Sequence, residues 1–126
     1  MTTTENKVLT VEQVAERFNF LAQQEKWFEI QDEFFTDDVK SVEPVGSPYM
    51  PSAKGKANVR KKAEDFIATI DEFHRAATSS PLVRGNHFAV GRELEVTVKK
   101  HGRIQMKQIM LYEVRNGKII SEQFFY

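Results

Sequence analysis

The chain has 126 residues, of which 40% are hydrophobic, and its 18 basic residues balance 18 acidic ones. This length and composition predict a single domain with its own core, and a net charge near zero gives no electrostatic basis for binding nucleic acid or an anionic membrane. The absence of cysteine excludes disulfides, thiolate metal sites and cysteine nucleophiles. With neither a signal-peptide core nor an apolar run of membrane-spanning length, we expect a cytoplasmic protein.

Three helices are predicted in the first half of the chain. Residues 1–9 form a polar segment that we expect to be a flexible tail. Thr10 and Gln13 then have the spacing of a capping box, and the apolar residues that follow recur at helical intervals. A second helical pattern covers residues 27–35, and a third begins at Lys56 after a break in the periodicity.

Two strands and a long loop are expected between and after these helices. Residues 39–45 alternate like a short strand, and residues 43–55 contain three prolines and two glycines, which predicts a loop able to serve as a rim or lid. Residues 71–82 form another strand candidate. A shift of one residue in its register decides whether Phe73 or His74 points to the core.

The last third of the chain, residues 87–126, predicts three long strands joined by two tight turns. Asn116-Gly117 is the strongest short hairpin signal, because both residues tolerate positive φ. For the first turn, a three-residue loop with Gly102 in the left-handed conformation places apolar residues opposite one another. The predicted registers pair Val98 with Ile104, Leu94 with Gln108, Val114 with Ile119, Tyr112 with Ser121, and Met110 with Gln123.

These registers place a polar patch in the middle of an otherwise apolar sheet face. Buried polar groups need partners, so the patch must be internally bonded, wet, or part of a cavity wall. Arg92 is its most informative member, because a guanidinium there would bind a carboxylate or carbonyl group, unless a bulge near Gly91 turns it outward to a surface ion pair. The candidate ligand-binding residues are Arg92, Gln108, Tyr112, Ser121 and Gln123, with Met110 and Trp27 as apolar walls.

The opposite face of the same sheet is half apolar, which indicates partial cover by another surface. Ile109, Leu111 and Phe124 lie on this face in the predicted register. We therefore expect a homodimer that forms through it.

Helices gathered before a long antiparallel sheet predict an α+β domain in which the sheet curls around the helices. The sequence also resembles the SnoaL-like branch of the nuclear transport factor 2-like superfamily, whose cone-shaped fold is shared with ketosteroid isomerase and scytalone dehydratase. The resemblance spans most of the chain from about Gln13. It is carried by FTDDV (35–39) with SVEP (41–44), GNHFAV (85–90), LEVT (94–97), YEVRNGKI (112–119) and EQFFY (122–126).

The resemblance implies a single domain with about three helices in the concave face of a curved, mainly antiparallel sheet. It implies a conical pocket for a small molecule and commonly a homodimer, but no fixed reaction, since members include isomerases, cyclases, dehydratases and hydrolases. Related sequences tend to carry an acidic residue where this chain has Gln108, which implies that the pocket lacks this acid.

His74 and Glu43 are the candidate catalytic residues. An imidazole titrates near working pH, and Glu43 lies beside the proline-rich loop, where the resemblance places the rim of the pocket. No characteristic spacing of metal ligands occurs, and we expect no metal and no cofactor. Two hypotheses follow: an enzyme that transfers a proton on a carbonyl- or carboxylate-bearing molecule, or a ligand-binding or dimerisation module without catalysis.

Overall fold

The computed structural model describes residues 7–126, and its elements follow the predicted order. They are α1 (Val11–Ala22), α2 (Trp27–Phe34), β1 (Phe35–Val42), β2 (Ala53–Lys54), α3 (Lys56–Ala68), β3 (Ile70–Thr78), β4 (Leu82–Arg84), β5 (His87–Val98), β6 (Gly102–Arg115) and β7 (Lys118–Phe125). Most of the predicted tail, residues 1–6, lies outside the described residues.

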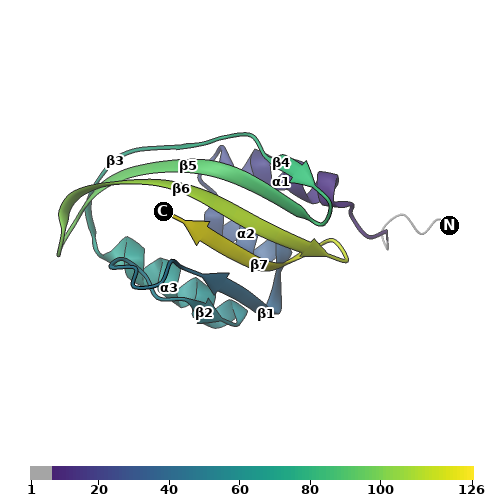
Figure 1. Ribbon diagram of the computed structural model, residues 1–126, viewed down its shortest axis with the longest axis horizontal. Coiled ribbons are helices and arrows are strands. Elements are labelled where there is room, and N and C mark those ends of the chain that lie inside the picture. The colour runs from purple at the N-terminus through teal and green to yellow at the C-terminus, as the bar shows by residue number, and fades with distance from the viewer. Residues whose placement is uncertain (1–6) are drawn as a thin grey trace.

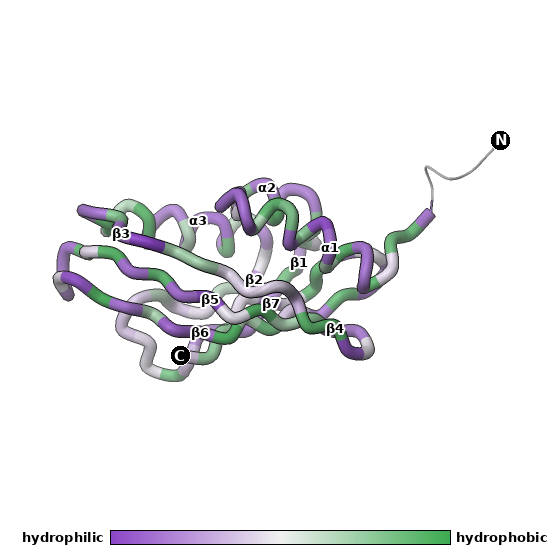
Figure 2. The backbone as a smooth tube through the Cα atoms, turned by 90° about the horizontal axis from the view of Figure 1, so that it is seen from above, coloured by the Kyte–Doolittle hydropathy of each residue, from purple (hydrophilic) through white to green (hydrophobic). Residues whose placement is uncertain are grey.

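The strands form one curved sheet in the order β2-β1-β7-β6-β5-β3, with β4 paired to β5. The pairing of β1 with β7 is parallel and the other pairings are antiparallel. Figure 1 shows the sheet curling from β3 round to β1, and Figure 2 shows the three helices along one side of it. The α+β cone predicted from the sequence is therefore confirmed.

The capping box at the start of α1 is present as predicted. The Thr10 side chain accepts a hydrogen bond from the Gln13 backbone at 3.1 Å, and the Gln13 side chain accepts one from the Thr10 backbone at 2.9 Å. The helix buries Phe18 against Phe88 of β5 and Tyr112 of β6, with ring centroids 4.9 Å and 4.7 Å away. These contacts join the first helix to the sheet in the main core cluster.

The hairpin between β5 and β6 has the predicted turn but a different register. Gly102 has φ +68°, so the left-handed residue was placed correctly. However, Val98 pairs with Gly102 rather than Ile104, and Leu94 pairs with Met106. Because this error is two residues and side chains alternate with a period of two, the predicted inner and outer faces of both strands are unchanged.

The hairpin between β6 and β7 contains a β-bulge that the sequence analysis missed. Asn116 and Gly117 both have positive φ, and Val114 pairs with Ile119 as predicted. One residue later the register shifts, so Tyr112 pairs with Glu122 instead of Ser121. Beyond the bulge, every side chain of β7 therefore lies on the face opposite to the predicted one.

Two element boundaries also differ from the prediction. β1 begins at Phe35, directly after α2, whereas a strand was expected over residues 39–45. The strand expected over residues 71–82 is divided into β3 and β4. The Ser79 backbone N–H donates to the Gly91 carbonyl at 2.8 Å just beyond β3, so the chain stays against β5 across this break. Among residues 7–126, no helix is long and apolar enough to cross a membrane.

Candidate functional site

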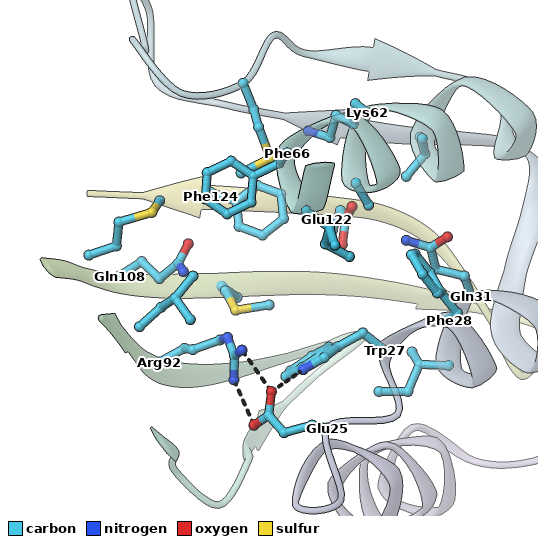
Figure 3. A pocket seen from close by; sticks show the side chains of 18 of the residues that line it. Glu25, Trp27, Phe28, Gln31, Lys62, Phe66, Arg92, Gln108, Glu122 and Phe124 are labelled. Atoms are coloured by element: carbon cyan, nitrogen blue, oxygen red, sulfur yellow. Dashed lines mark hydrogen bonds and ion pairs between the residues drawn. The ribbon is translucent and has the colours of Figure 1, made fainter. Parts of the chain in front are cut away.

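A cavity of about 540 Å³ lies between α2, α3 and the concave face of the sheet. This volume is within the range of small-molecule sites, which are concave, mostly apolar and carry a few well-placed polar groups. Figure 3 shows side chains from both layers pointing into the space. Its apolar walls include Trp27, Phe28, Ile30, Phe35, Met50, Val59, Phe66, Leu94, Met106, Met110 and Phe124.

Glu122 of β7 is the least expected polar group in the cavity wall. Its carboxylate is buried and accepts a 2.6 Å hydrogen bond from Ser41 of the neighbouring strand β1. Burial raises the pKa of Glu122 to about 7, and the charge of Glu43 also raises it, while the bond from Ser41 and the charge of Lys62 oppose the shift. Glu122 is thus a carboxyl group that exchanges its proton near neutral pH.

Tyr112 of β6 lies directly opposite Glu122 in the sheet register and lines the same cavity. Its side chain is fully buried, stacked on Phe88 with ring centroids 5.0 Å apart. Burial and the neighbouring Glu122 hold the pKa of Tyr112 well above its ordinary value. Its hydroxyl therefore stays protonated as a hydrogen-bond donor, and the carboxyl group of Glu122 is the neighbour that it faces.

Lys62 of α3 and Glu43, just beyond β1, form a buried ion pair at one side of the cavity. Lys62 Nζ lies 2.6 Å from Glu43 Oε2, and the two side chains are only 6% and 1% exposed. The Tyr126 hydroxyl donates to the other Glu43 oxygen at 2.6 Å. Because both carboxylate oxygens have partners, this charge is compensated despite its burial.

Arg92 of β5 lies at the opposite side of the cavity and is held by a residue of the α1–α2 loop (Figure 3). Its guanidinium donates to both oxygens of Glu25 at 2.9 Å and 3.1 Å and lies over the Trp27 ring. Trp27 Nε1 also donates to Glu25, at 2.9 Å. Although partial burial opposes it, these hydrogen bonds from Arg92 and Trp27 lower the pKa of Glu25. The alternative in which Arg92 turns outward is excluded, because β5 and β6 pair without a bulge at Gly91.

Six of the nine candidate residues named from the sequence line this cavity. They are Trp27, Glu43, Arg92, Gln108, Met110 and Tyr112. The prediction was wrong for Ser121 and Gln123, which the bulge in β7 turns to the outer face, where Gln123 is exposed. Gln108 lines the space in place of the acid that related sequences tend to carry there, and Glu122 and Glu43 supply carboxylates from other positions.

His74, the other proposed catalytic residue, does not line the cavity. Phe73 pairs with Val96 on the inner face of the sheet, and His74 lies on the outer face with Nε2 2.7 Å from the Thr97 hydroxyl. His74 therefore forms a hydrogen bond between the adjacent strands β3 and β5, which is a structural role. The sequence left its orientation open, and the geometry removes it from the group of residues that face a ligand.

The predicted dimer face also changes composition. Phe124 lines the cavity, whereas Phe125 is exposed beside its strand partner Ile109, with Leu111 half-buried nearby. Lys62 and Glu25 are pocket residues that the sequence analysis overlooked. A lysine on an amphipathic helix and an acid in a short loop carry no signal that separates them from solvated surface residues.

Within residues 7–126, no three histidine, aspartate or glutamate side chains are grouped so as to hold a metal ion.

A half-open sheet wrapped around three helices, with a mostly apolar cavity between them, defines the cone-shaped fold of the nuclear transport factor 2-like superfamily. Within that superfamily, the chain belongs to the family of SnoaL-like domains, whose profile matches residues 9–126. A search of curated protein sequences finds no match.

The solved structures similar to this chain include one from Mesorhizobium loti, described as a SnoaL-like polyketide cyclase with carbohydrate phosphatase as a second designation. It is 32% identical, with a TM-score of 0.87 over 94% of this chain and 100% of that chain. An NTF2-like protein of unknown function from Burkholderia pseudomallei is 18% identical, with a TM-score of 0.72 over 92% of this chain and 89% of that one. TerC, crystallised with polyporic acid, is 15% identical, with a TM-score of 0.69 over 92% and 90% of the two chains. The last two likenesses describe the fold alone.

Proposed function

We propose that the chain binds a small, largely apolar molecule with a carbonyl or carboxylate group in this cavity and transfers a proton on it, as an isomerase or cyclase does. Glu122 is the proposed proton carrier, in place of the candidates His74 and Glu43. The observation that carries the proposal is a buried carboxyl group with a pKa of about 7 in the wall of an apolar cavity of about 540 Å³. General acids and bases work best when their pKa lies near the working pH.

The proposed step conserves protons and electrons within the site. The carboxylate form of Glu122 takes a proton from the carbon next to the ligand carbonyl, and the carbon–hydrogen electron pair moves into a new carbon–carbon double bond as the carbonyl becomes an enolate. In a ligand with a carbon–carbon double bond one position further from the carbonyl, the enolate is conjugated with that bond. Glu122 then returns the same proton to the far carbon of the conjugated system, the double bond moves next to the carbonyl carbon, and the carbonyl forms again. Tyr112, protonated beside Glu122, is the proposed donor to the enolate oxygen.

The contacts of Glu43 and the description of one relative both support Glu122 as the proton carrier. Glu43 is bound to Lys62 at 2.6 Å and to the Tyr126 hydroxyl at 2.6 Å, so both of its oxygens already have partners within the chain. The description of the Mesorhizobium loti relative as a polyketide cyclase is consistent with proton transfer on carbonyl compounds.

The predicted homodimer face contained Phe124, which lines the cavity; we propose the same interface with Phe125 in its place, beside Ile109 and Leu111. The cytoplasmic location stays a prediction.

The proposal is tested with 1-tetralone, a bicyclic ketone with exchangeable hydrogens beside its carbonyl. Proton NMR in deuterated buffer near neutral pH measures the loss of these hydrogens with and without the protein. We expect the chain to accelerate exchange, and Glu122→Gln to reduce the acceleration by about 100-fold or more, the usual contribution of a general acid–base group. Glu113→Gln, which removes a carboxylate from the outer face of β6, is the matched control and should exchange as the wild type does.

Thermal-shift titrations with 1-tetralone and with polyporic acid separate binding from catalysis. Stabilisation by either compound without accelerated exchange would favour a ligand-binding module over an enzyme. Exchange that is equally fast in Glu122→Gln would rule out this residue as the proton carrier.

A further inference from the structure

The two cations in the cavity wall, Lys62 and Arg92, are already bound to carboxylates of the chain itself. We infer that the cavity selects an uncharged carbonyl compound over a carboxylate, and that Glu25 and Glu43 set this selectivity by occupying the cations that would bind an anion. The inference rests on the proposed function and narrows its ligand class. It assigns Glu25 and Glu43 as specificity-determining residues.

The Lys62 ammonium group makes two hydrogen bonds and one cation–π contact. Its Nζ lies 2.6 Å from Glu43 and 3.3 Å from the Pro51 carbonyl oxygen, and it sits 5.2 Å from the centre of the Phe124 ring. Glu43 is fixed in turn by the Tyr126 hydroxyl and by its own backbone bond to the Ser52 side chain at 2.9 Å. A ligand carboxylate would have to displace a buried, multiply bonded carboxylate to reach this ammonium group.

Arg92 is occupied in the same way at the other side of the cavity. Besides the paired bonds to Glu25, its guanidinium donates to the Thr78 hydroxyl at 3.0 Å and covers the Trp27 ring at 4.6 Å. Glu25 has φ +58°, an uncommon conformation for a residue other than glycine. Such a conformation persists where surrounding contacts determine it, and here those contacts hold the carboxylate on Arg92.

The overall charge of the cavity wall also disfavours an anion. Four carboxylates and two cations line the space, so its formal charge is −2 with Glu122 ionised and −1 with Glu122 protonated. A carboxylate ligand would leave water for a mostly apolar space of like charge, and among residues 7–126 both cations of the wall are already paired. A ketone or ester avoids this cost and still accepts hydrogen bonds from Tyr112 and from protonated Glu122.

Two isosteric probes test the inference: 1-acetylnaphthalene, which is neutral, and 1-naphthoate, in which a negative oxygen replaces the methyl group. Quenching of Trp27, the single tryptophan of the chain, measures the dissociation constant of each probe at constant pH and salt. We expect the ketone to bind at least about tenfold more tightly to the wild type, the effect of about one charge-assisted hydrogen bond.

Glu25→Gln frees Arg92 and should tighten naphthoate binding by about tenfold while ketone binding changes by less than about twofold. Glu43→Gln frees Lys62 and should act in the same direction. Glu29→Gln is the matched control, because Glu29 lies exposed at the cavity edge and removing its charge frees no cation. Glu29→Gln removes one unit of negative charge as Glu25→Gln does, but it should change the ratio of the two affinities by much less.

Naphthoate binding to the wild type as tightly as the ketone would overturn the inference and leave the proposed pocket standing. Equal shifts in Glu29→Gln and Glu25→Gln would also overturn it, since net charge alone would then explain selectivity. Failure of both probes to bind any variant would instead remove the proposed function, on which the inference rests. Glu25 is 41% exposed, so its variant tests the idea even if Glu43→Gln fails to fold.

Discussion

The buried carboxyl group of Glu122 should make the stability of this protein depend on pH in a direction opposite to that of most acidic residues. Its pKa is about 7 in the folded chain against 4.5 for an ordinary glutamate, so the folded state holds the proton more tightly than the unfolded state. The stabilising contribution of the neutral form is complete below about pH 4.5 and is lost as the pH rises to about 7 and beyond. A shift of this size corresponds to roughly 3 kcal/mol of unfolding free energy.

Glu122→Gln tests this reasoning, because glutamine has the same shape and does not titrate. Urea unfolding followed by Trp27 fluorescence gives the unfolding free energies of both proteins at about pH 4 and pH 8. Relative to the variant, the wild type should lose roughly 3 kcal/mol between these two values. Glu113→Gln, altered on the outer face of the neighbouring strand, should follow the wild type. If the difference between wild type and Glu122→Gln is constant with pH, the carboxyl titrates normally and the proposed proton carrier is lost.

Three further outcomes follow from the packing. Lys62→Met should reduce the unfolding free energy by about 3–5 kcal/mol because it leaves Glu43 buried without its cation, and adding Glu43→Gln should restore much of it in the same urea assay. Ile119→Ala, at a fully buried position of β7, should cost about 2–5 kcal/mol, measured by urea unfolding, whereas a loss below about 1 kcal/mol would contradict its placement in the core. Ile109→Lys should convert a dimer to a monomer in light scattering after size exclusion, and an unchanged mass would place any interface elsewhere.

Local signals in the sequence were sufficient to predict the overall fold. The capping box at Thr10 and the turn at Asn116-Gly117 depend on hydrogen bonds and backbone angles within a few residues, and both formed as predicted. Alternation of apolar residues also assigned the inner faces of β5 and β6 correctly. An error of two residues in their register did no harm to that assignment, because it preserves the parity on which the faces depend.

Local sequence signals did not predict that Glu122 and Lys62 line the cavity. A bulge interrupts the alternation of apolar and polar residues just before Glu122. The three residues Phe124-Phe125-Tyr126 would then place an aromatic side chain on either face of the sheet. The sequence therefore does not tell which side chains of β7 face inward after Ile119. Glutamate side chains are usually exposed to solvent, so Glu122 was expected on the outer face of the sheet. Exceptions to this rule are found mainly at functional sites. Lys62 likewise has no local signal of burial, because its partner Glu43 is 19 residues away in the sequence and meets it only in the folded chain.

The bulge in β7 decides which side chains of this strand face the cavity. Without the extra residue, the continuing register would turn Ser121 and Gln123 inward, and β7 would offer the ligand a hydroxyl and an amide, neither of which titrates near neutral pH. The shift instead places Glu122 beside the buried Ser41 of the parallel strand β1, where the hydroxyl satisfies one carboxylate oxygen and the surrounding apolar groups raise the pKa. One extra residue in the strand therefore replaces a hydroxyl and an amide in the cavity wall with a carboxyl group whose pKa is about 7.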